Sequence, residues 1–105
     1  RDLAVVLDID MSILGEPWER YRRYADGVRA EYVPAAVSAR RFAAGRMMFL
    51  SRLLGGGAIF HTPEGADRWE RAARQNVARE LEDLRRGAAF FSRLMARVIF
   101  RRRAS

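Results

Sequence analysis

Two carboxylates near the start of the chain are the first residues whose type and position could do chemistry. Residues 2–14 are expected to form a helix. One stripe of that helix carries five apolar side chains: Leu3, Val6, Leu7, Ile13 and Leu14. Asp10 falls in the middle of this stripe, whereas Asp8 points to roughly the opposite side. An ionised carboxylate that faces a core is costly unless a cation, hydrogen bonds or a metal compensates it. The spacing therefore predicts that Asp10 faces inward and has such a partner.

Further polar residues share helix faces with apolar side chains. They are Arg29, Arg46, Asn76 and Glu80. A buried guanidinium is normally paired, and its planar fork suits a carboxylate. We expect Arg46 or Arg29 to meet Glu80, and we expect Asn76 to cap neighbouring backbone. A structural network of this kind is one interpretation of these residues, and a supporting role at a site is the alternative.

These residues must be positioned by helices, because the chain shows no strand-like alternation of any length. Glycine and proline divide it into about five helical segments, at Gly15, at Pro34, at the triple glycine 55–57 and at Gly87. The expected helices cover roughly residues 2–14, 17–32, 35–54, 62–86 and 88–103, with Thr62 as a plausible N-cap. The fold class is therefore all-α, with residues 1–87 as one unit and residues 88–105 as a basic amphipathic C-terminal helix.

Length and composition bound the function. The chain has 105 residues, half of them apolar and none of them cysteine, which indicates one globular domain with neither disulfides nor a thiolate metal site. No apolar run approaches the roughly 20 residues of a membrane span. The start, Arg1-Asp2-Leu3, has neither an initiator Met nor a signal-peptide layout, so we expect the interior of a longer, cytoplasmic chain.

An ordered set of short motifs resembles a bacterial group of HD-superfamily phosphohydrolases thought to depend on a metal. The segments that carry the resemblance are 8–15 (DIDMSILG), 18–21 (WERY), 28–32 (VRAEY), 42–46 (FAAGR), 59–62 (IFHT) and 76–81 (NVAREL). They match, in order, that group's DADLAILG, Y…(I/V)RxEY, F..GR, (I/L)(F/Y)xT and N(L/V)xxEL patterns. The resemblance spans about residues 2–86 and implies a helical domain of the HD type.

The resemblance also implies a divalent metal that activates water for attack on a phosphate ester, often of a nucleotide. Its ligands in the group are a His, a His-Asp doublet and a distant Asp. Asp10 matches that distant Asp, and Asp8 would then be a flanking acid that supports it. The other ligands lie upstream in the group, and this chain begins just before the last one. The resemblance therefore implies the C-terminal portion of such a domain, inactive alone, that binds no metal by itself. Its partner would be the N-terminal half of the domain, or a second copy through exposed apolar faces.

His61 is the only histidine, and it lies downstream of the last ligand. The group places no ligand at this point, so we expect a packed or capping residue rather than a metal ligand.

The basic charge is local to the C-terminus. Residues 87–105 carry no acid, and the other 86 residues account for only +2 of the net charge of +7. The arginines of this tail are Arg93, Arg97, Arg101, Arg102 and Arg103. Three interpretations stay open: packing against the domain, binding to a membrane surface or acidic partner, and electrostatic binding to nucleic acid. No recognisable motif supports specific nucleic-acid binding. A small basic binding module is thus the alternative to the enzyme fragment.

Overall fold

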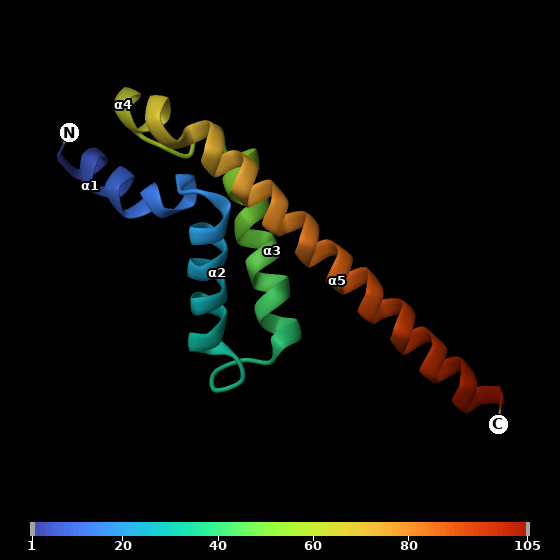
Figure 1. Ribbon diagram of the computed structural model, residues 1–105. Coiled ribbons are helices and arrows are strands. Elements are labelled where there is room, and N and C mark those ends of the chain that lie inside the picture. The colour runs from blue at the N-terminus through green and yellow to red at the C-terminus, as the bar shows by residue number, and fades with distance from the viewer. Residues whose placement is uncertain (1, 105) are drawn as a thin grey trace.

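The computed structural model describes residues 2–104, and among them the side chains of residues 3–90 and 93–97. Within this range the chain is all-α, as the sequence predicts, and contains no strand. The four longer helices are α1 (Asp2–Met11), α2 (Trp18–Tyr32), α3 (Ala39–Gly55) and α5 (Arg71–Ala104). Figure 1 shows α2 and α3 side by side under the first half of α5, with α1 beside the short α4 (Pro63–Gly65).

The helix boundaries follow local sequence signals. Ser38 caps α3, because its hydroxyl accepts a hydrogen bond from the backbone N–H of Arg41. Thr62 caps α4 in the same way through the N–H of Gly65, as predicted. The expected first helix is shorter than residues 2–14, since a 3₁₀ turn, η1 (Ser12–Gly15), follows α1. A single π-helical turn, η2 (Ala66–Glu70), joins α4 to α5.

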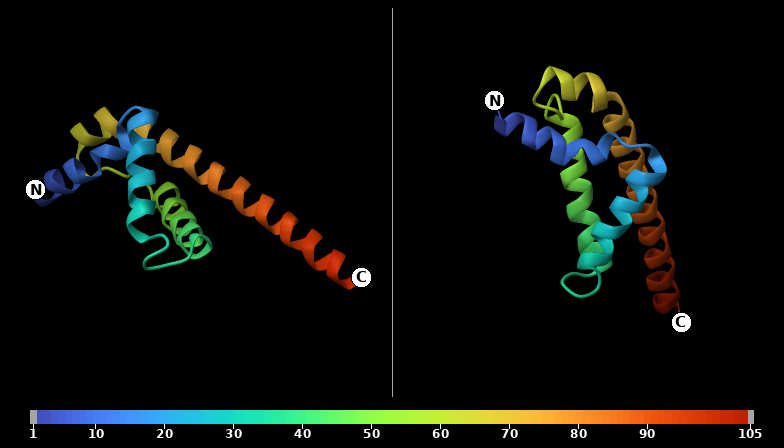
Figure 2. Two further views of the ribbon diagram at one scale, coloured as in Figure 1. Left: turned by 60° about the horizontal axis from the view of Figure 1, so that its bottom comes forward. Right: turned by 60° about the vertical axis from the view of Figure 1, so that its left-hand side comes forward.

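Gly87 does not end a helix, which corrects the predicted break. α5 runs without interruption from Arg71 to Ala104. A glycine inside a helix costs only about 1 kcal/mol relative to alanine, and a long run of good helix formers on both sides outweighs this. In Figure 1 and in the left view of Figure 2, the second half of α5 extends well beyond the other helices, and the molecule measures 64 Å along its longest axis.

The core lies where η1, α2 and α3 meet the first half of α5. Its buried apolar members are Leu14, Tyr21, Leu50, Ile59, Phe60, Ala73, Val77 and Leu81. On α3 the buried residues are Arg46 and Leu50, while Phe49 is 45% exposed. Gly15 is a point of close approach: a Cβ added there would lie 2.7 Å from the Cβ of Trp69. A glycine is therefore required where η1 crosses η2.

Candidate functional site

The two N-terminal acids occupy the reverse of the predicted positions. Asp8 is buried, with 2% of its surface exposed, whereas Asp10 is exposed. The helical geometry was predicted correctly, since the two side chains lie on opposite sides of α1, but the inward side was not. Leu3, Val6 and Leu7 are exposed together with Asp10, so the apolar stripe of α1 faces away from the described chain. The inward orientation of Asp8 is instead set by hydrogen bonds.

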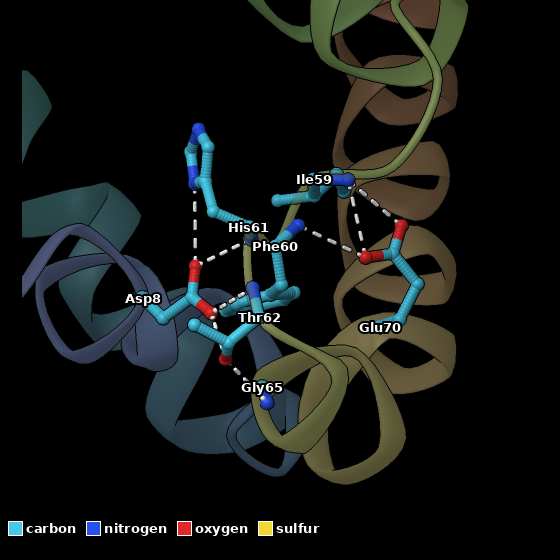
Figure 3. Close-up of polar contacts among 7 residues, drawn as sticks. All are labelled: Asp8, Ile59, Phe60, His61, Thr62, Gly65 and Glu70. Carbon is cyan, nitrogen blue, oxygen red and sulfur yellow. Dashed lines mark hydrogen bonds and ion pairs between the residues drawn. The ribbon is translucent and has the colours of Figure 1, made fainter. Parts of the chain in front are cut away.

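Asp8 accepts hydrogen bonds from the segment that follows the triple glycine (Figure 3). Its Oδ1 accepts from the backbone N–H of His61 at 2.7 Å, and its Oδ2 accepts from the backbone N–H of Thr62 at 2.8 Å and from the Thr62 hydroxyl at 2.6 Å. The Nδ1 atom of His61 lies 3.3 Å from Oδ1. Burial by itself would raise the pKa of the Asp8 carboxyl, but these hydrogen bonds outweigh it and lower the pKa to about 2. Asp8 is therefore a carboxylate at neutral pH and holds α1 against the loop.

Glu70 holds the same segment from the other end. It accepts hydrogen bonds from the backbone N–H groups of Ile59 and Phe60 at 3.0–3.1 Å, so two carboxylates receive four consecutive N–H groups (Figure 3). Glu70 also pairs with Arg74, whose guanidinium donates to the carbonyls of Leu54 and Gly57 at the end of α3. The sequence reasoning missed Glu70; its only local signal is the i,i+4 spacing to Arg74.

A second polar cluster lies between α2, α3 and α5. The Arg46 guanidinium donates to both oxygens of Glu80, at 2.8 and 3.0 Å, and the Tyr21 hydroxyl donates to Glu80 as well. Their side chains are 8% exposed for Arg46 and 14% for Glu80. Burial acts to lower the pKa of Arg46, but the facing Glu80 carboxylate raises it above its usual value. Burial and the Glu80 carboxylate both raise the pKa of Tyr21. The cluster is thus an ion pair with a neutral phenol.

Of the other polar residues considered from the sequence, one is buried and hydrogen-bonded, and two are exposed. Asn76 is buried and donates its side-chain amide to the carbonyls of Leu14 and Glu16, at 2.8 and 2.7 Å, which fastens η1 to α5. This agrees with its predicted capping role. Arg29 is exposed and lies outside the Arg46–Glu80 pair. His61 is exposed at its ring and contacts Asp8, so it is neither packed nor a cap.

The described residues alone do not form a metal site. No group of three or more His, Cys, Asp or Glu side chains among them converges as ligands of one ion would. Asp8 uses both oxygens in hydrogen bonds to the loop, and Asp10 lies on the opposite side of the helix. Asp10 therefore has the accessibility that a ligand requires but lacks companions within this part of the chain.

Only two of the five tail arginines have side chains among the described residues. Arg93 and Arg97 are exposed on α5, while the side chains of Arg101, Arg102 and Arg103 lie outside the described residues. No helix in the described part of the chain is both long and apolar enough to cross a bilayer.

No family model, curated protein sequence or solved structure matches this chain.

Proposed function

We propose that this chain is the C-terminal portion of an HD-type phosphohydrolase domain, inactive alone, in which Asp10 is presented to residues outside the chain. The observation that carries the proposal is the outer face of α1. There an acid lies among Leu3, Val6 and Leu7, all of which are exposed, at 69%, 52% and 38%. Contiguous exposed apolar surface on a native protein normally marks a contact with something else.

The orientation of this face is fixed rather than incidental. The four hydrogen bonds that Asp8 makes to His61 and Thr62 set the rotation of α1 about its own axis. With Asp8 turned inward, Asp10 must point outward, since the two side chains lie about 160° apart at 100° per residue. A segment that packed on α1 would bury Asp10 among apolar side chains. A carboxylate in that position needs a cation or hydrogen-bond donors, which is the environment of a metal ligand.

The motifs behind the family resemblance contain residues that make polar contacts between different elements of the fold. Asp8 meets Thr62, Tyr21 meets Glu80 and Arg46, and Asn76 holds η1. Residues from five separate motifs therefore bind one another across the fold. This supports the view that the motifs form one structural unit, whose role is to hold α1 with Asp10 outward.

The metal chemistry of the group requires several converging ligands, and the described residues of this chain do not supply them. What this chain's residues do is orient one carboxylate. The other function, binding of a membrane surface or another acidic partner by the tail, is favoured by a separate observation: Arg93 and Arg97 are exposed on α5.

The test begins with the gene. We expect the reading frame to continue upstream of the Arg1 codon and to encode a His and a His-Asp doublet. The protein from that longer frame should hydrolyse p-nitrophenyl phosphate or nucleoside monophosphates with Mn²⁺ present. Asp10→Asn should lower kcat/KM by about 100-fold or more, as expected for loss of a ligand. The matched control is Asp67→Asn, an exposed acid in η2, and it should leave activity unchanged.

Three results would refute the proposal. One is a start codon close upstream with no such residues between. Another is a longer protein that hydrolyses neither class of substrate. The third is an Asp10→Asn variant as active as the Asp67→Asn control.

A further inference from the structure

The rotation of α1 about its own axis depends on few contacts. Of the α1 side chains that the structure describes, residues 3–11, only Asp8 is buried, while Ala4 and Met11 are half-buried and the others are exposed. Apolar packing therefore does little to fix this rotation. The contacts of Asp8 with the start of α4 must fix it instead, and two residues there, Thr62 and Gly65, meet its carboxylate (Figure 3).

The Thr62 hydroxyl is hydrogen-bonded on both sides. Its oxygen accepts the backbone N–H of Gly65 at 3.0 Å, and it donates its proton to Oδ2 of Asp8 at 2.6 Å. The direction of both bonds is settled, because a backbone N–H can only donate and an ionised carboxylate can only accept. Hydrogen bonds to a charged acceptor are also stronger than neutral ones. The hydroxyl thus ties the first turn of α4 to α1.

Gly65 leaves the space that the Asp8 carboxylate occupies. A Cβ built at residue 65 would lie 2.9 Å from Cγ of Asp8 and closer still to its Oδ2, and it would lie 3.1 Å from the Thr62 hydroxyl oxygen. The φ angle of Gly65 is −65°, an ordinary helical value, so the requirement for glycine is steric and not conformational. A side chain at residue 65 would have to displace Asp8 or turn α1.

We propose that Thr62 and Gly65 are positioning residues for Asp10, because together they set the rotation of α1 and so the direction in which Asp10 points. The inference rests on the proposed function only for what Asp10 does there. Asp8 and Asp10 belong to one rigid helix, so a rotation that moves one moves the other through the same angle. A side-chain end lies about 5 Å from the helix axis, so a rotation of about 45° moves it by about 4 Å. A misplacement of about 1 Å can already cost about 100-fold in rate.

The direction of α1 can be measured in the 105-residue chain, which contains no cysteine. Nitroxide labels at Ile9→Cys on α1 and Gln75→Cys on α5, both exposed positions, report one distance by double electron–electron resonance. We expect a single narrow distribution for the labelled parent chain. Thr62→Val and Gly65→Ala should shift its maximum by about 4 Å or broaden it by as much. Circular dichroism checks that each variant folds.

Four further variants separate positioning from helix capping and from added bulk. Thr62→Ser keeps the hydroxyl and should keep the narrow distribution. Thr62→Asp keeps a capping side chain but places a second carboxylate against Asp8, so it should disturb α1 as Thr62→Val does. Ser38→Ala removes the cap of α3, and Gly45→Ala adds a Cβ to α3 in open space. Both of these controls should leave the distance unchanged.

A second measurement connects this geometry to Asp10 in the longer protein whose activity tests the proposed function. We expect Thr62→Val and Gly65→Ala to raise the Mn²⁺ concentration that gives half of the metal-dependent rise in Tm by about tenfold or more. A loss of this size is expected when a group that orients a metal ligand is removed. Thr62→Ser should bring that concentration back to within about threefold of the parent value.

Unchanged distance distributions in both Thr62→Val and Gly65→Ala would overturn the proposal, because α1 would then keep its rotation without them. So would a displaced α1 with an unchanged Mn²⁺ requirement in a longer protein whose Asp10→Asn variant has lost its response to Mn²⁺. An Asp10→Asn variant that keeps the full response would refute the proposed function instead. The distances in the 105-residue chain would still decide whether Thr62 and Gly65 set the direction of Asp10.

Discussion

Replacing Glu80 by alanine tests how the α2–α3–α5 junction is held together. The change leaves the Arg46 guanidinium, 8% exposed, without its carboxylate, and leaves the buried Tyr21 hydroxyl without its acceptor. Removing one partner of a buried ion pair costs about 3–5 kcal/mol, because the remaining charge stays buried and uncompensated. The unpaired hydroxyl adds about 1 kcal/mol. We expect a loss of about 4–6 kcal/mol in the free energy of unfolding, out of about 5–15 kcal/mol for a domain of this size.

The assay is urea unfolding followed by circular dichroism. A loss of that size should lower the midpoint by about 2–3 M, at a slope of about 2 kcal/mol per M. The matched control is Glu82→Ala, whose carboxylate is 54% exposed and pairs with Arg86 on the surface, and it should cost no more than about 0.5 kcal/mol.

A third variant separates the buried charge from the loss of attraction. Tyr21→Phe/Arg46→Met/Glu80→Leu removes every polar group of the cluster, so it should be within about 1–2 kcal/mol of the parent chain. If Glu80→Ala costs less than about 1 kcal/mol, the cluster does not hold the junction. If the triple variant is as unstable as Glu80→Ala, the reasoning from uncompensated charge is wrong.

Three other predictions concern Asp8, Gly15 and metal binding. The pKa of Asp8 is lowered from 3.8 to about 2, so the stability it contributes is complete above pH 3.8 and is lost as the pH falls towards 2. Urea midpoints measured from pH 5 to pH 2 should show this loss. The Asp8→Asn variant should show a flatter dependence of the midpoint on pH over that window. Gly15→Ala should lower the free energy of unfolding by about 1–3 kcal/mol, because its Cβ would lie 2.7 Å from the Cβ of Trp69. Gly27→Ala has open space in α2 and should raise it by about 0.5–1 kcal/mol. Equal effects of the two changes in urea unfolding would contradict the close approach at η1. The 105-residue chain should show the same Tm with and without Mn²⁺, and a rise in Tm that Asp10→Asn abolishes would contradict the prediction that it binds no metal by itself.

Local patterns predicted much of the fold. The absence of strand-like alternation predicted an all-α chain, and Thr62 caps its helix as expected. We predicted that Arg46 or Arg29 pairs with Glu80, because a buried guanidinium on one helix needs a carboxylate on another, and Arg46 is the one that does. These predictions succeed because each depends on residues within a few turns of one another, or on a simple requirement that buried charges be paired.

The inward face of α1 could not be predicted in this way. Periodicity shows which residues share a face, and it correctly separated Asp8 from Asp10, but it assigns the apolar face to the core by default. In this chain the backbone N–H groups of His61 and Thr62, more than 50 residues away, attract Asp8 instead. Nothing in the local sequence indicates that a loop will present four consecutive donors. The predicted break at Gly87 was wrong for the opposite reason, since a local breaker was given more weight than the long helix around it.

The two acids of α1 therefore have separable roles, and the difference changes how Asp10 should be interpreted. The burial of Asp8 is accounted for by its hydrogen bonds, which hold the 59–62 segment. Asp10 has no such explanation within the described residues, and it stands among apolar side chains that are exposed with it. A soluble helix that needed only to be held by Asp8 would be expected to carry polar residues on its outer face. The apolar character of that face supports the proposed contact, and the carboxylate within it would require that contact to supply a cation or hydrogen-bond donors.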